Sequence, residues 1–217
     1  MKDSAKLSWD RIFQQKGKVF TRPQEDIPKI IKLFKKENVQ KVLDLGCGSG
    51  RHTVYLAKHG FDAYGLDISK HGIKIAKGWL KKEKLKANFK IEDMYKKLPY
   101  KNNFFDAIVS TQTLHHGRIE KIRKLIKEIK RILRPNGLMF ITVRKEVAKK
   151  YIPREKLYGI KYIAPRTYVI LGGPEKGSPH YRFNKKILRK EFREFKILNL
   201  WVRGTHYCLL GQLKNKN

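Results

Sequence analysis

The chain has 217 residues and a formal net charge of +32, from 51 basic against 19 acidic side chains. Its apolar fraction of 41% suffices for one domain with a sizeable core, and no stretch reaches the roughly 18 apolar residues that a membrane helix requires. Two cysteines without metal-ligand spacing and a start without an apolar leader argue against a zinc finger, a disulfide framework and a secreted precursor, and favour a cytoplasmic protein. A monomer or a homodimer is expected.

The predicted elements begin with two helices, over residues 3–17 and 24–37. Strands and helices then alternate, with strands at 41–45, 62–66, 88–92 and 105–110, and with helices at 50–59 and from an N-cap at Ser69 to about residue 85. An amphipathic helix over 118–133 precedes a turn at 134–137 and a strand at 138–143. Strands that alternate with helices form right-handed crossover units, so the pattern predicts an α/β fold with a mostly parallel sheet.

This alternation stops over residues 144–183. The four prolines and four glycines of that segment predict a loop-rich insertion within the single domain, and loops of such length are usually functional. The chain then continues with a helix over 185–192 and two strands, 195–202 and 206–213. A tight antiparallel hairpin is expected where they join, at Arg203-Gly204.

A glycine-rich segment, VLDLGCGSGRH, follows the first predicted strand and contains Gly46, Gly48 and Gly50. Bare backbone amides before a helix suit a nucleotide-like ligand that must approach closely. A dinucleotide fingerprint would need glycine at Arg51, and a phosphate-binding loop would need Gly-Lys-Ser/Thr, which is absent. The three glycines preceded by Asp44 match neither pattern.

The segment resembles the D-x-G-x-G-x-G motif of class I S-adenosylmethionine-dependent methyltransferases, and the resemblance covers most of the chain. GLDIS at 65–69, EDM at 92–94, FDAIVS at 105–110 and LRPNGL at 133–138 are similar to the later motifs of that family, in the same order. The resemblance implies a Rossmann-like fold: a mostly parallel seven-stranded sheet with a C-terminal antiparallel hairpin strand and helices on both faces.

The resemblance also implies the residues that bind S-adenosylmethionine. Asp44 would face the amino group and sulfonium, Asp67 would accept the ribose hydroxyls, and Asp93 would bond the adenine amino group. Some of these positions also suit a purely structural role: Asp67 as a helix cap, Met94 as core filler, and residues 1–38 as an ordinary amphipathic helix in place of a lid. The other implied cofactor residues are Gly46, Cys47, Gly48, Gly50, Ile68, Glu92, Met94 and Thr111, with Trp9 and Arg22 from the lid.

Candidate acceptor residues follow the fourth predicted strand, in STQTLHHG. His115 or His116 can take a proton near neutral pH, although a hydrogen-bonded loop explains the pair as well. In similar type 11 and tellurite-resistance-like methyltransferases of archaea and bacteria, a Pro-His-aromatic segment and a Gly-x-His-Tyr segment line or cover the acceptor. The resemblance therefore makes 144–183 a substrate cover and adds the candidate catalytic residues Tyr168, His180 and His206.

Three functions stay open on this basis. The first is methyl transfer from S-adenosylmethionine to a small molecule by in-line displacement, with S-adenosylhomocysteine as product and Arg166 pairing an anionic acceptor. The second is RNA methylation guided by the basic surface, although no RNA-binding domain is appended and Ser110–Thr113 replaces an Asn-Pro-Pro-Tyr type motif. The third is a nucleic-acid-binding protein without catalysis, against which the intact cofactor motifs argue. No metal site is predicted.

Overall fold

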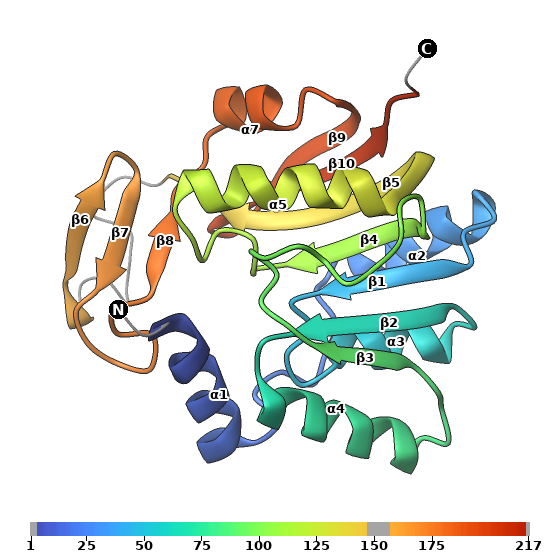
Figure 1. Ribbon diagram of the computed structural model, residues 1–217, viewed down its shortest axis with the longest axis horizontal. Helices are drawn as coiled ribbons and strands as arrows, with labels where there is room; N and C mark the ends of the chain where they lie inside the picture. Colours follow the sequence, from blue (N-terminus) through green and yellow to red (C-terminus); the bar gives the residue numbers. More distant parts are fainter. Residues whose placement is uncertain (1–3, 147–156, 216–217) are drawn as a thin grey trace.

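The computed structural model describes residues 4–146 and 157–215, which are organised around a seven-stranded sheet of order β3-β2-β1-β4-β5-β10-β9 (Figure 1). The first five strands are parallel: β1 (Lys41–Leu45), β2 (Asp62–Asp67), β3 (Asn88–Ile91), β4 (Phe105–Thr111) and β5 (Leu133–Arg144). In contrast, β10 (His206–Leu213) is antiparallel to both β5 and β9 (Phe195–Arg203). This topology confirms the predicted Rossmann-like sheet and its C-terminal hairpin.

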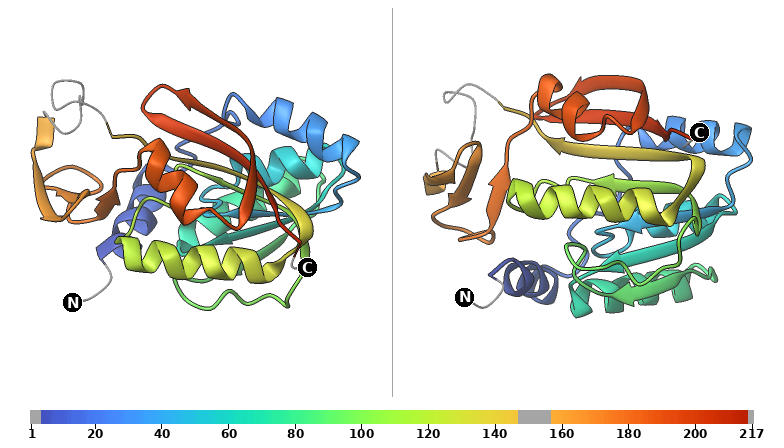
Figure 2. Two further views of the ribbon diagram at one scale, coloured as in Figure 1. Left: turned by 90° about the horizontal axis from the view of Figure 1, so that it is seen from above. Right: turned by 45° about the horizontal axis from the view of Figure 1, so that its top comes forward.

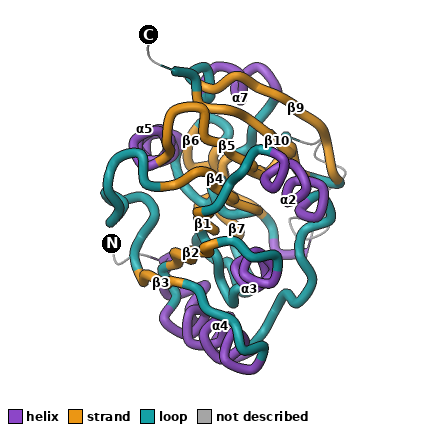
Figure 3. The backbone as a smooth tube through the Cα atoms, turned by 90° about the vertical axis from the view of Figure 1, so that its right-hand side faces the viewer, coloured by secondary structure: helices purple, strands orange, loops and turns teal. Residues whose placement is uncertain are grey.

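Helices cover both faces of the sheet, as the end-on view in Figure 3 shows. α2 (Ile27–Lys36) and α3 (Arg51–Lys58) lie on one face, and α5 (Ile119–Ile132) lies on the other together with α7 (Lys185–Glu191). α4 (Lys70–Lys82) packs against α3, β2 and β3. Within the described ranges, no helix is both long and apolar enough to cross a bilayer.

The central strands divide their side chains between two cores. Successive side chains of a strand point to opposite faces, so Ile108 of β4 packs in the core beneath α5, whereas Ala107 and Val109 pack in the core beneath α2 and α3. β5 alternates in the same way, with Met139 beneath α5 and Phe140 on the opposite face. Burial on both faces explains why these strands read as continuous apolar runs.

Two predicted segments differ from the structure. The expected turn at 134–137 lies inside β5, where Asn136 has a φ of 59° and the pairing with β4 shifts register. The loop-rich insertion contains a second, antiparallel sheet of order β6-β7-β8, formed by β6 (Ile160–Ala164), β7 (Thr167–Ile170) and β8 (Pro179–Tyr181). Residues 147–156 of the predicted insertion and 1–3 of the predicted lid lie outside the described residues.

The small sheet and α1 (Ser4–Lys16) both lie at the carboxyl ends of the parallel strands (Figures 1 and 2). Asp10 fixes α1 to the start of α4, because its carboxylate accepts hydrogen bonds from the Ser69 hydroxyl at 2.7 Å and the His71 amide at 3.0 Å. The Tyr181 amide of β8 donates to the His115 carbonyl at 2.8 Å. Both elements therefore cover the edge where ligands bind in folds of this type.

Candidate active site

A cavity of about 860 Å³ lies at the carboxyl edge of the sheet, beneath α1 and the small sheet. This volume falls within the usual range of small-molecule sites. Among the predicted site residues, Arg22, Asp44, Gly50 and Arg166 do not line it. The predicted residues that line it are Trp9, Gly46, Cys47, Gly48, Asp67, Ile68, Glu92, Asp93, Met94, Thr111, His115, His116, Tyr168, His180 and His206.

The glycine loop forms the floor of the cavity and is held in place by β2. The Gly46 amide donates to the Leu66 carbonyl at 2.8 Å, and the Gly48 amide donates to Asp67 Oδ2 at 2.7 Å. Gly46 has a φ of 80°, and a Cβ at this position would overlap the side chain of Thr113. Burial raises the pKa of the Cys47 thiol, which keeps it in the neutral form expected of a small apolar residue.

Asp67 ends β2 and joins the loop to the start of α4. Its second oxygen accepts the Ser69 amide at 2.8 Å, while the Ser69 hydroxyl caps α4 by accepting the Gly72 amide at 2.9 Å, as predicted. Burial raises the pKa of the Asp67 carboxyl group, although the amide hydrogen bonds oppose the rise. Ser69 is therefore the cap of α4, and Asp67 lies before it, accepts its amide and lines the cavity.

Acids at the end of β3 form the neighbouring wall. Glu92 accepts the Asp93 amide at 2.9 Å, and Asp93 accepts the Tyr95 amide at 2.9 Å. The Tyr95 hydroxyl donates to the Leu114 carbonyl at 3.1 Å and so links this segment to the one after β4. Met94 is buried and borders both the core and the cavity.

Asp44 lies beneath the loop and is almost wholly buried. Thr53 donates to Asp44 Oδ2 from its amide at 3.0 Å and from its hydroxyl at 2.7 Å. The other oxygen, Oδ1, has no hydrogen-bond partner among the described residues and lies 3.9 Å from His52 Nδ1. Burial raises the pKa of the Asp44 carboxyl group to about 7, despite the hydrogen bonds from Thr53.

This environment predicts a stability that depends on pH. An acid with a raised folded-state pKa binds protons more tightly in the folded chain, so stability falls as the pH rises from about 4 to about 7 and stays low above that. At pH 8 without cofactor, Asp44→Asn is expected to raise the free energy of unfolding by about 2–4 kcal/mol, since one pKa unit corresponds to 1.36 kcal/mol. The gain should shrink towards pH 4.

Urea unfolding at several pH values measures this effect. Asp62→Asn, which changes an exposed carboxylate of β2, serves as the control and should follow the wild-type profile. Parallel pH profiles for Asp44→Asn and the wild type would show that Asp44 is not held in an environment that favours its neutral form.

Four histidines gather in the part of the cavity beneath the small sheet. The His115 ring centroid lies 4.4 Å from that of His116 and 5.8 Å from that of His206, and His116 lies 4.6 Å from His180. Burial and the neighbouring imidazoles lower the pKa of His115 well below its ordinary value and that of His116 to about 3, while burial beside Arg144 lowers that of His206 to about 4. Tyr168 stacks on His180 at 5.3 Å.

Three predicted residues lie elsewhere. Gly50 has a φ of 89° at the N-cap of α3 and packs directly against Ala76 of α4. Arg22 lines a neighbouring cavity of about 530 Å³ that shares Phe20, Arg51, Gln112 and His206 with the larger one. Arg166, the expected partner of an anionic acceptor, pairs instead with Glu146 and donates to the Arg182 carbonyl at 2.9 Å, outside the cavity wall.

Several lining residues were not predicted. Arg51 and His52 immediately follow the glycine loop, so their place in the first turn of the helix after such a loop is the signal that could have identified them. Tyr95 directly follows the predicted residue Met94, and Thr113 lies two residues after the predicted residue Thr111. Glu175 has no comparable signal, because it lies in an irregular segment between β7 and β8.

Comparisons with known proteins agree with this geometry. Residues 43–141 match the family model of the type 11 methyltransferase domain. A ubiquinone biosynthesis O-methyltransferase of Pelagibacter ubique is 33% identical over 123 residues, which is 57% of this chain and 49% of that protein. The chain thus matches about half the length of this relative.

Solved structures share the fold. A protein of Pyrococcus horikoshii superposes with a TM-score of 0.73 at 21% identity, over 94% of this chain and 99% of that one. A 1,6-didemethyltoxoflavin-N1-methyltransferase of Burkholderia thailandensis, solved with 1,6-didemethyltoxoflavin and S-adenosylhomocysteine, superposes with a TM-score of 0.71 at 18% identity, over 98% and 88%. The narrower tellurite-resistance-like branch stays a prediction. Residues 43–141 of this chain therefore match the type 11 methyltransferase domain, and the chain shares the fold of solved S-adenosylmethionine-dependent methyltransferases.

Proposed function

We propose that the protein transfers a methyl group from S-adenosylmethionine to a small-molecule acceptor. The observation that supports this most is the cavity of about 860 Å³, which joins the glycine loop and the acids after β2 and β3 to the histidines beneath the small sheet. Such a volume suits a cofactor with a compact acceptor beside it. The similar structure of a 1,6-didemethyltoxoflavin-N1-methyltransferase also holds a small molecule, 1,6-didemethyltoxoflavin, together with S-adenosylhomocysteine.

The residues on the cavity wall suit the parts of the cofactor. Asp67 at the end of β2 offers a carboxylate to the ribose hydroxyls, and Asp93 at the end of β3 offers one to the adenine amino group. Asp44 lies beneath the loop and does not line the cavity, so its contact with the amino group and sulfonium of the cofactor stays a prediction. When bound, S-adenosylmethionine supplies a methyl group already activated by its sulfonium, so the protein mainly orients the reactants and excludes water.

The acceptor side is formed by the segment after β4 and by the small sheet. His115, His116, Tyr168, His180 and His206 enclose it and are proposed to position the acceptor. A general base is not required for displacement at a sulfonium carbon, and a role of His115 or His116 as general base stays a prediction. The protein is proposed to act in the cytoplasm.

Incubating the protein with tritiated S-adenosylmethionine and separate cell fractions tests this proposal. We expect label in the small-metabolite fraction with the wild type and none with Asp67→Ala. Label confined to the RNA or protein fraction would contradict a small-molecule acceptor.

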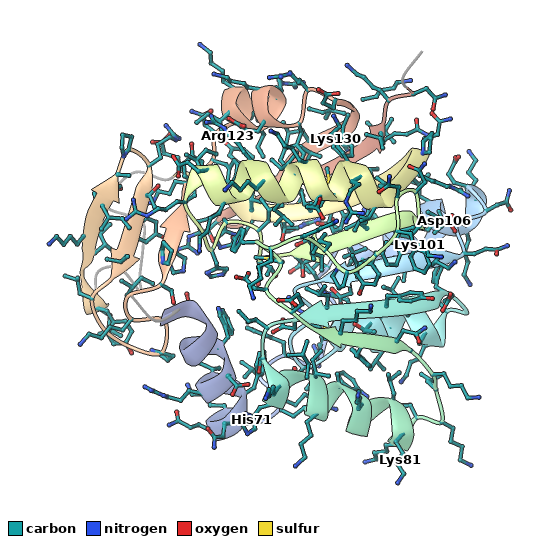
Figure 4. All side chains as sticks on the ribbon, in the orientation of Figure 1. His71, Lys81, Lys101, Asp106, Arg123 and Lys130 are labelled. Carbon is teal, nitrogen blue, oxygen red and sulfur yellow. The ribbon has the colours of Figure 1, made fainter. Side chains whose placement is uncertain are left out.

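RNA methylation remains the second candidate, because the net charge of +32 attracts polyanions. The basic side chains are nevertheless spread over separate elements: Figure 4 shows Lys81 on α4, Lys101 before β4 and Lys130 on α5 in different places. Such a distribution favours weak and non-selective attraction of phosphates over a dedicated RNA surface.

Any affinity for tRNA is therefore expected to fall by at least ten-fold between about 50 and 200 mM salt, because counterion release dominates such binding. Fluorescence anisotropy with labelled tRNA measures the fall, and an unrelated RNA of the same length is the control. A salt-insensitive complex that distinguishes the two RNAs would make RNA the preferred substrate.

A further inference from the structure

Three side chains with metal-binding groups converge on the acceptor side of the cavity. One ligand atom each from His116, Glu175 and His180 lies within 4.8 Å of the other two. His116 follows β4, whereas Glu175 and His180 come from the small sheet and the segment before β8. Ligand atoms around a tetrahedral zinc ion lie about 3.3 Å apart, given bonds of about 2.0–2.2 Å. Small movements of the three side chains would therefore bring their ligand atoms to the distances that one ion requires.

His180 has an acceptor at each ring nitrogen. Nδ1 lies 2.9 Å from the Ser178 carbonyl, and Nε2 lies 2.8 Å from the Glu175 carboxylate. A neutral imidazole carries only one N–H, and if Nδ1 donates it to the carbonyl, the lone pair of Nε2 faces a negative oxygen. That arrangement requires a proton or a cation between the two groups: a second proton on the ring, a proton on the Glu175 carboxyl group, or a bound metal ion.

His116 has an unprotonated ring nitrogen on the same side of the cavity. Its Nε2 lies 3.1 Å from the Gln112 carbonyl, which only accepts, so this nitrogen carries the proton. Its Nδ1 is buried and has no hydrogen-bond partner among the described residues. Metal-binding histidines usually donate one ring N–H to a backbone carbonyl or carboxylate and bind the metal through the other, unprotonated nitrogen. His180 shares this arrangement through Ser178.

We propose that His116, Glu175 and His180 bind one divalent transition-metal ion, with Zn²⁺ as the matching probe. Two imidazoles and one carboxylate form the protein ligand set of catalytic zinc sites that leave a position open. The three residues line the cavity, so the open position would face the acceptor. No spacing motif in the sequence indicates this site, because His116 is distant in sequence from Glu175 and His180.

The role of the ion, unlike its binding, rests on the proposed methyl transfer. An acceptor hydroxyl or thiol at the open position loses its proton more readily. The proton would pass to water, and the oxygen or sulfur lone pair would form the bond to the methyl carbon. The carbon–sulfur bond of the cofactor would break at the same time, with its electron pair left on sulfur.

Equilibrium dialysis against buffered Zn²⁺, followed by elemental analysis, tests the binding. The wild type is expected to hold one Zn²⁺ per chain, and His116→Ala, Glu175→Gln and His180→Ala are each expected to weaken binding at least ten-fold. His59→Gln is the control, because this histidine bonds the Tyr55 carbonyl at the end of α3, outside the cavity. Glu175→Gln preserves the side-chain shape, and thermal unfolding of each variant checks that it is folded.

Co²⁺ gives a second readout in the same proteins. We expect visible absorption bands of a four- or five-coordinate site in the wild type and in His59→Gln, and their loss in the three ligand variants. The proposal is wrong if the wild type binds no Zn²⁺, or if the three variants bind it within two-fold of the control. It is also wrong if ¹⁵N NMR shows protons on both ring nitrogens of His180 in excess Zn²⁺.

Calorimetry with S-adenosylmethionine on the same samples separates this proposal from the proposed function. Zinc binding without cofactor binding would contradict methyl transfer and leave the metal site standing. Cofactor binding without zinc binding would contradict the metal site alone.

Discussion

Asp67→Ala is expected to weaken the binding of S-adenosylmethionine at least 100-fold. The carboxylate ends β2 on the cavity wall, where two ribose hydroxyls can donate to it. Hydrogen bonds to a charged group contribute about 1.5–3 kcal/mol each, and about 1.4 kcal/mol corresponds to a ten-fold change in affinity. Two lost bonds therefore account for about two orders of magnitude or more. Isothermal titration calorimetry measures the change.

Controls must separate cofactor binding from folding, because Asp67 also accepts the Gly48 and Ser69 amides. Asp67→Asn retains one acceptor oxygen and should lose less affinity than Asp67→Ala. Asp62→Ala removes an exposed acid at the opposite end of the same strand and should bind as the wild type does. If folded Asp67→Ala binds the cofactor with unchanged affinity, Asp67 is not the ribose ligand.

Gly50→Ala is expected to lower the free energy of unfolding by about 2–4 kcal/mol. The φ of 89° is unfavourable for any residue with a Cβ, and the new Cβ would lie 2.6 Å from Ala76 Cβ. Because α3 and α4 meet at this contact, overpacking adds about 1–3 kcal/mol to the backbone cost. Urea unfolding measures the loss.

Gly78→Ala is the matched control, and it should raise the free energy of unfolding instead of lowering it. Gly78 lies within α4, and a Cβ there would meet nothing within 4 Å. Alanine in a helix interior should stabilise the protein by about 0.5–1 kcal/mol. If Gly50→Ala instead keeps its stability and loses affinity for S-adenosylmethionine, Gly50 serves the cofactor directly rather than the packing of α3 on α4.

The central fold could be predicted because its periodic segments are long. The stripe from Ile27 to Phe34 and the capping serine at Ser69 both have the predicted role. The small sheet could not, since β6, β7 and β8 have only five, four and three residues and alternate with glycines and prolines. In windows this short, periodicity cannot distinguish a strand from a loop.

The predicted strand bounds also show at which edge of the parallel sheet each acid lies. Asp67 and Asp93 follow strand ends and line the cavity. Asp106, in contrast, lies near the start of β4 at the opposite edge (Figure 4), where it accepts the Gln40 and Lys41 amides and pairs with Arg134 at 2.9 Å. Glu175 reaches His180 only through the fold of an irregular segment, which no spacing rule captures.

A crystal structure grown with S-adenosylhomocysteine tests the central claim most directly. We expect the nucleoside to occupy the cavity at the carboxyl ends of β1, β2 and β3, with its ribose hydroxyls about 3 Å from the Asp67 carboxylate. Its adenine should lie beside Met94. A cavity without the nucleoside at saturating concentration, in crystals that instead take up a nicotinamide dinucleotide or a nucleoside triphosphate there, would contradict the account.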